Sequence, residues 1–189
     1  RSGRWFAYQH AGITPDVVTL AKGMGSGVPI GAIVARSTLA EVLQPGTHGS
    51  TFAGSPLICA AALAVLETIR EENLVERAAE MGAHLLGRLR DLARTCPVIT
   101  EVRGRGLMVA LELSIPSEPI VAACLERGLL VNAIGDGVVR LAPALTLTAE
   151  EADEGVARLA SAIAAPEASS RSTIRVTRLI CSMRSVRTA

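Results

Sequence analysis

The 189-residue sequence is poor in several residue types, and each shortage narrows the possibilities. Aromatic residues make up 2% of the chain against 49% hydrophobic residues, so any buried core must be aliphatic. A net charge of +1 gives no basic surplus with which to bind nucleic acid or an anionic membrane. The longest apolar run, over 57–66, is too short to span a bilayer. Residues 1–10 lack the apolar stretch of a signal peptide, so we expect a cytoplasmic protein.

Two reactive residue types are also scarce. The cysteines show no CxxC spacing and have no histidine at ligand spacing, so we expect reduced thiols and no metal site; they are Cys59, Cys96, Cys124 and Cys181. Lys22 is the only lysine, and the other 18 of the 19 basic residues are arginines. Coding bias can explain the shortage, but arginine cannot replace an amine nucleophile because its guanidinium stays protonated. The one amine side chain is therefore a candidate for chemistry.

Hydrophobic patterning in the first part of the chain predicts two strands and a helix. The apolar residues over 17–20 predict a short buried strand, and those over 28–35 predict a second strand. Ser55 followed by Pro56 is typical of a helix start, with an N-cap and a proline at the first helical position. The run from there to about residue 70 is apolar nearly all round, which predicts a buried helix.

The pattern changes to that of an α+β unit over residues 71–165. Asn73 and Glu76 resemble a capping box, which predicts an amphipathic helix to about residue 94. The expected elements that follow are a half-buried strand over 107–113, a helix over 117–127 closed by Gly128, a β-hairpin over 129–141 around Gly135-Asp136-Gly137, and a last helix from a Thr148–Glu151 capping box to about Ala164.

The tail over 166–189 differs in composition from the rest. It carries five arginines and one acid, and no turn or cap residues organise its few apolar residues. We expect a disordered or non-native extension, and the alternative is a basic interaction tail.

The segment around Lys22 has two interpretations. Its flanking glycines, Gly23, Gly25 and Gly27, could serve only a tight turn. They could instead let the backbone approach a planar cofactor while the amine forms a Schiff base with the cofactor's aldehyde.

Four segments in order resemble the motifs of the class III (ornithine-type) pyridoxal-phosphate-dependent aminotransferases. They lie at 12–32, which includes Lys22, and at 48–56, 102–108 and 138–143. The resemblance covers residues 1 to about 164, and the acetylornithine branch of the family is the most similar, on the evidence of residues 1–7 and 29–32. It implies a partial α/β fold of type I: residues 1–70 as a remnant of the large cofactor-binding domain and residues 71–165 as the C-terminal small domain.

The resemblance also implies roles for four residues. Lys22 would bind pyridoxal 5'-phosphate covalently and move a proton during the reaction. Thr51 would hold the cofactor phosphate, from the partner subunit of a homodimer, and Ser50 would contact the substrate. Arg140 would pair with a substrate carboxylate or with a gating acid, since its fork suits either. Ser50 and Thr51 as ordinary loop residues, and Arg140 as a surface charge, remain the alternatives.

Other polar residues in or near these motifs are expected to be structural. His10 and His48 are interpreted as structural, and Arg103 and Arg105 as residues that shape a turn. Ser26 stands where the family usually has glycine, which could loosen the loop that follows the lysine.

The reaction implied is transfer of an amino group from N-acetylornithine to 2-oxoglutarate, within arginine biosynthesis. The partners are therefore small amino acids and 2-oxo acids. The alternatives are an aminotransferase for ornithine or 4-aminobutyrate, and a non-catalytic gene fragment. The family's phosphate loop and the aspartate beside the pyridine nitrogen have no counterpart here, so we expect this chain alone to be inactive or nearly so.

Overall fold

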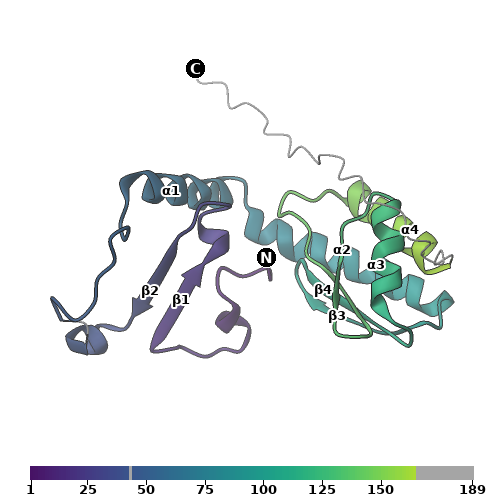
Figure 1. Ribbon diagram of the computed structural model, residues 1–189, viewed down its shortest axis with the longest axis horizontal. Helices are drawn as coiled ribbons and strands as arrows, with labels where there is room; N and C mark the ends of the chain where they lie inside the picture. Colours follow the sequence, from purple (N-terminus) through teal and green to yellow (C-terminus); the bar gives the residue numbers. More distant parts are fainter. Residues whose placement is uncertain (43, 165–189) are drawn as a thin grey trace, which may run out of the picture.

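A computed structural model of the protein describes residues 1–42 and 44–164, and the tail predicted over 166–189 lies outside them. The described elements form two groups along the chain (Figure 1). The first contains a two-stranded sheet and helix α1, and the second contains a four-stranded sheet with helices α2, α3 and α4. The fold is thus mixed α/β, as predicted, with the four-stranded sheet in the C-terminal part.

In the first group, β1 (Val17–Ala21) pairs antiparallel with β2 (Gly31–Ala35). A one-turn 3-10 helix, η2 (Lys22–Met24), begins where β1 ends. Two strands were predicted here, but the prediction that the first is buried is wrong: its residues alternate between half-buried and exposed. No third strand joins the pair within the described chain, so the outer edge of each strand has no paired neighbour.

Helix α1 (Pro56–Glu71) has the predicted bounds, with Pro56 in its first turn. Ser55 makes no side-chain cap hydrogen bond. The prediction of a buried helix is also wrong, because only Ala62 is buried and Leu57 is 78% exposed. The helix is apolar, as predicted. It packs mainly against α2 and η2, however, which leaves most of its surface without a partner.

The second group carries the core. Its sheet has the order β3 (Ile99–Arg105), β4 (Met108–Leu113), β6 (Val138–Leu141) and β5 (Asn132–Ile134), antiparallel throughout. Its helices are α2 (Leu74–Thr95), α3 (Ser117–Glu126) and α4 (Ala149–Ala164). The predicted helices, hairpin and alternating strand in this part are confirmed. Strand β3 was not predicted, because the segment ITEVRGR is mostly polar and exposed.

Alternation along β4 gives the sheet two different faces. Val109 and Leu111 are buried with Val139 of β6 in the cluster that α2 and α4 complete. Residues opposite one another in the register share a face, so Arg103, Ala110 and Arg140 form a row across β3, β4 and β6 on the other side. That open face carries the charged residues of the sheet.

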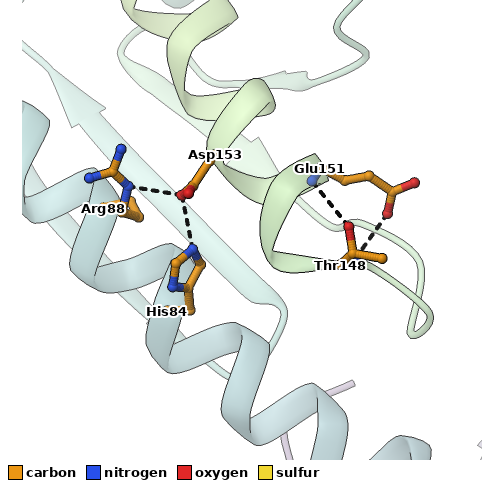
Figure 2. A network of polar contacts seen from close by, with 5 residues as sticks. All are labelled: His84, Arg88, Thr148, Glu151 and Asp153. Atoms are coloured by element: carbon orange, nitrogen blue, oxygen red, sulfur yellow. Dashed lines mark hydrogen bonds and ion pairs between the residues drawn. The ribbon is translucent and has the colours of Figure 1, made fainter.

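The two predicted capping boxes have opposite outcomes. At α4 the prediction is confirmed: the Glu151 backbone N–H donates to Thr148 Oγ1 at 3.2 Å, and the Thr148 N–H donates to the Glu151 carboxylate at 2.9 Å (Figure 2). At α2 it is wrong, because Asn73 lies in the left-handed region at φ 51° and makes no side-chain cap bond. Asn73 instead turns the chain between α1 and α2, which follow one another almost directly.

The first residues of the chain lie against the second group. Leu107 donates its backbone N–H to the Arg1 carbonyl at 2.8 Å, and the Arg1 guanidinium donates to the Pro143 carbonyl. A Cβ on Gly82 of α2 would overlap the Gly106 carbonyl, so helix and turn touch backbone to backbone. Gly106, at φ 55°, is thereby held between α2 and the start of the chain.

Candidate functional site

Lys22 is exposed and lies where β1 ends, in an unusual backbone conformation. Its φ is 45°, and Ser26, four residues on, has φ 44°. Residues other than glycine adopt this left-handed region rarely, and such residues gather at functional loops. Gly25 between them is buried, and a Cβ there would lie 2.7 Å from the Val28 carbonyl oxygen. The loop therefore needs glycine at one position and accepts local strain at two others.

A cavity of about 600 Å³ lies beside this loop. Leu20, Ala21, Gly23 and Met24 form one part of its wall, so residues on both sides of Lys22 line it although Lys22 itself does not. The other walls come from the N-terminal segment, α1 and the loop before α4, through Arg1, Trp5, Phe6, Leu63, Leu66, Glu67, Ile69, Arg70 and Leu145. Its volume is in the range of small-molecule sites, and its lining is mostly apolar.

Ser50 and Thr51 lie in an exposed turn between the 3-10 helix η3 (Ser37–Val42) and α1. The Ala53 N–H donates to the Ser50 carbonyl at 3.3 Å across this turn. Neither residue lines the cavity beside Lys22. Their hydroxyls are open to bind a ligand, but within the described chain they are not placed around Lys22.

Arg140 lies on β6, on the open face of the four-stranded sheet. Its guanidinium donates to Asn132 Oδ1 of the neighbouring strand at 3.3 Å. It lines a second hollow, also of about 600 Å³, together with Ser2, Ala7, His10, Arg103, Gly104, Arg105, Met108, Val109 and Ala110. The predicted site residues therefore lie in three places: Lys22 in its loop, Ser50 with Thr51 in an exposed turn, and Arg140 on the sheet.

The two arginines predicted to shape a turn have different environments. Arg103 ties β3 to β4, because its Nη1 lies 2.7 Å from a Glu101 carboxylate oxygen and 2.6 Å from one of Glu112. These carboxylates, Glu112 first, raise the pKa of the Arg103 guanidinium. The turn itself depends on Gly104 and Gly106, whose neighbours leave no room for a Cβ. Arg105 makes no ion pair within the described residues.

A polar cluster between α2 and α4 was not predicted (Figure 2). Asp153 accepts hydrogen bonds from His84 Nε2 at 2.9 Å and from Arg88 Nε at 2.8 Å. The contact with His84, more than that with Arg88, lowers the pKa of the Asp153 carboxyl. His84 and Arg88 stand four residues apart on α2, hence on one face, and this spacing is the sequence signal that could have indicated a shared partner. The cluster joins two helices and lies apart from Lys22.

Over residues 1–42 and 44–164, no three His, Cys, Asp or Glu side chains gather in a way that could hold a metal ion. No helix in the same ranges is long and apolar enough to cross a membrane.

The sequence model of the aminotransferase class-III family matches residues 1–163. The chain belongs to the class III aminotransferases. This family depends on pyridoxal phosphate, which is the chemistry expected from the glycine-flanked lysine. The chain is 51% identical, over 154 residues, to acetylornithine aminotransferase 1 of Bordetella bronchiseptica, a match that covers 82% of this chain and 39% of that relative.

Other class III members give the same picture. The chain is 43% identical over 169 residues to an ornithine aminotransferase of an Exiguobacterium strain, across 89% of this chain and 42% of that one. It superposes on acetylornithine aminotransferase from Elizabethkingia anophelis with a TM-score of 0.82 and 34% identity, across 87% of this chain and 42% of that one. The chain thus spans about two fifths of the length of these relatives and has part of the aminotransferase fold.

Proposed function

We propose that this chain carries the lysine and the C-terminal part of an aminotransferase that moves an amino group from N-acetylornithine to 2-oxoglutarate. The observation that carries the proposal is Lys22, the only amine side chain, in a glycine-rich loop with positive φ beside an apolar cavity. The 51% identity to an acetylornithine aminotransferase supports the choice of amino donor. Arginine biosynthesis is the setting this reaction implies, and the proposal places the protein in the cytoplasm.

The residues present fit pyridoxal phosphate on one side. Lys22 supplies the amine for covalent attachment, and Leu20, Met24 and the neighbouring cavity wall supply apolar surface against a planar ring. When bound, the cofactor supplies an electron sink for the carbanion formed at the substrate. The hydroxyls of Ser50 and Thr51 suit a phosphate, yet they lie in an exposed turn of the same chain. We therefore propose that Thr51 reaches the phosphate bound at Lys22 of a second copy, in a homodimer.

Each residue then has one task. The Lys22 amine would take the proton from the substrate carbon that bears the amino group, which requires the amine to be unprotonated at that moment. Arg140 orients the substrate through its carboxylate with two parallel N–H donors. Ser50 contacts the substrate from the second copy. We propose residues 1–70 as part of the cofactor domain and 71–165 as the small domain that carries Arg140.

Ornithine is the second candidate donor. The Exiguobacterium relative is an ornithine aminotransferase, and it covers 89% of this chain at 43% identity. The two donors differ in the N-acetyl group, which removes the charge of the amine that does not react. A transamination assay with each donor and 2-oxoglutarate compares the two directly.

Borohydride reduction in the presence of pyridoxal phosphate tests the proposal. Because Lys22 is the only lysine, peptide mass spectrometry needs to distinguish only one side chain from the N-terminal amine. We expect a phosphopyridoxyl adduct on Lys22 well above that on the N-terminal amine and above that in a urea-denatured control. Lys22→Arg keeps the charge and should lose the adduct. Labelling equal to the denatured control would refute a formed cofactor site.

A further inference from the structure

Strands β1 and β2 lead into and out of the loop that carries Lys22, so their register determines where that lysine lies. Ala21, the last residue of β1, stands opposite Gly31, the first residue of β2, and Lys22 follows Ala21 directly. A shift of the pairing by two residues would move one strand along the other by about 7 Å. Lys22 would then move by the same amount relative to β2.

The side chains of the two strands do little to fix this register. Thr19 is the only polar residue in either strand, so a shifted pairing would still place apolar residues beside apolar residues. Register is specified strongly where a shift would expose a hydrophobic face or bury a polar one. The ribbon therefore depends on a further contact to select one pairing.

The loop between the strands does not select the pairing either. It covers residues 22–30 and is longer than the two-residue turns that define the register of a hairpin. Two backbone bonds shape it from within: Gly25 donates to the Lys22 carbonyl at 3.1 Å, and Val28 donates to the Gly25 carbonyl at 3.2 Å. Neither bond involves a residue of β1 or β2.

Arg36 supplies such a contact at the opposite end of the ribbon. It follows β2 directly, and its backbone N–H donates to the Asp16 carbonyl at 3.0 Å. Its guanidinium donates to the Thr14 carbonyl at 2.9 Å and lies 3.3 Å from the Asp16 carboxylate. Thr14 and Asp16 come just before β1, so one arginine binds the start of that strand at three points.

The three contacts act together. The Arg36 and Asp16 side chains are 47% and 73% exposed, and an ion pair this exposed stabilises little by itself. The bond to the Thr14 carbonyl adds a hydrogen bond from a charged group. A shift by two residues would place Arg36 opposite Thr14 or Val18, where the backbone bond to Asp16 is lost. The described register is therefore the one in which all three contacts form.

We infer that Arg36 is a positioning residue for Lys22, because it selects the register of β1 and β2 that places the lysine at the start of its loop. The inference rests on the proposed function only in that Lys22 there binds the cofactor. It gives a task to a surface arginine that lines neither the cavity beside Lys22 nor the hollow beside Arg140.

Disulfide trapping in the full chain tests the register and does not involve the cofactor. Thr19 lies opposite Ile33, and Ala35 lies two residues further along the same face of β2. Because Arg36 and Asp16 share a backbone bond, the alternation along the ribbon makes Thr19 and Ile33 a non-hydrogen-bonded pair, whose side chains lie close together. In one chain that carries Thr19→Cys, Ile33→Cys and Ala35→Cys, position 19 can bond to 33 in the described register or to 35 in a shifted one.

Tandem mass spectrometry of the linked peptides gives the ratio of the two bridges after mild oxidation. We expect the 19–33 bridge to dominate. Adding Arg36→Gln should lower the ratio of 19–33 to 19–35 by about tenfold, as expected when a hydrogen bond from a charged group is lost. Arg36→Lys keeps the charge but not the planar fork, so it should recover part of the ratio.

Arg94→Gln is the matched control, because Arg94 forms an exposed ion pair with Asp91 near the end of α2, away from the ribbon. The inference is overturned if Arg36→Gln and Arg94→Gln give the same ratio of bridges. It is also overturned if the 19–33 bridge does not exceed the 19–35 bridge when Arg36 is present.

Labelling of Lys22 with pyridoxal phosphate and borohydride, in chains without the added cysteines, tests the effect on the lysine. Arg36→Gln should lower the adduct on Lys22 severalfold while thermal melting of the second group of elements stays unchanged. An unchanged adduct would overturn the positioning role. A register that depends on Arg36, with no Lys22 adduct in any variant, would refute the proposed function and support the selection of register by Arg36.

Discussion

The region before residue 72 and the region from 74 to 164 are both rich in aliphatic residues, but only the second buries them. Apart from Ala62, every buried hydrophobic residue of the described chain belongs to the second region. Helix α1 is the more apolar helix and is largely exposed, whereas α2 is the more polar and buries one whole face. Burial is therefore set by the partner that a helix finds and not by its composition alone.

The strands of the two regions have similar sequence patterns but different numbers of packing partners. β1 and β4 both alternate, but β4 has helices on one side and a strand on each edge, and β1 has one neighbour. Ile33 and Val34 of β2 remain 64% and 55% exposed. A surface of this kind is unusual in a protein that stands alone.

The largest expected effect on stability comes from a substitution that would create a cavity in the core of the second region. Leu111→Ala, at a fully buried position of β4, should lower the free energy of unfolding by about 3 kcal/mol. Leu57→Ala, on the exposed face of α1, should change it by less than about 0.5 kcal/mol. Urea denaturation followed by circular dichroism measures both. Equal losses would mean that α1 is covered in solution and that the contrast between the regions is smaller than described.

The next effect comes from two glycines within α2. Gly82→Ala places a methyl group against the Gly106 backbone, which cannot rotate away, and should destabilise the chain by about 2–3 kcal/mol. Gly87→Ala, where an added Cβ meets nothing within 4 Å, should stabilise it by about 0.5–1 kcal/mol through helix propensity. Opposite signs in thermal melting are the expected result. The same sign for both would contradict the close crossing of α2 over the β3–β4 turn.

The two regions also differ in their helix caps, and the expected effect on stability is smaller. Thr148→Ala removes a formed cap of α4 and should lower the free energy of unfolding by about 1 kcal/mol. Ser55→Ala at the start of α1 should change the free energy of unfolding by less than about 0.5 kcal/mol, because the Ser55 side chain makes no cap bond. The pair can be compared in one urea series. A loss at Ser55 as large as that at Thr148 would show a cap that the structure lacks.

The smallest effect is a pH dependence that resides in the second region. The pKa of Asp153 is lowered in the folded state from its ordinary value of 3.8, so its bonds to His84 and Arg88 stabilise the fold above that value. This stabilisation is lost as the pH falls below it and the carboxylate takes up a proton. The melting temperature of Asp153→Asn should therefore lie below that of the unchanged chain at pH 7 and approach it at pH 3. A constant difference would exclude this titration.

The comparison also shows how far the sequence alone can go. Hydrophobic periodicity and the residues typical of caps and turns predicted α2, α3, α4 and the β5–β6 hairpin. These predictions succeeded because each apolar face finds a partner nearby in the fold. Strand β3 was not predicted because it has few hydrophobic residues. Its outward residues, Arg103 and Glu101 among them, form ion pairs on the face of the sheet. The capping box at Asn73 failed since the backbone there turns left-handed to join two helices.

The candidate site was predicted residue by residue but not in its arrangement. The glycines around Lys22 pointed to chemistry, and the resemblance supplied Ser50, Thr51 and Arg140. No pattern in the sequence could show that these residues lie in three separate places of one chain. Proximity across the sheet is a property of register, and register needs the fold.

The backbone bond between Arg1 and Leu107 has a consequence for the order of folding. The chain starts on the four-stranded unit, leaves it to make β1, β2 and α1, and returns at α2. The bond therefore closes a loop of about a hundred residues. The entropic cost of closing that loop must be offset by contacts that have already formed nearby. Local hairpins and the α2–β3 pair can assemble first, so the junction that unites the two regions is the step expected to form last.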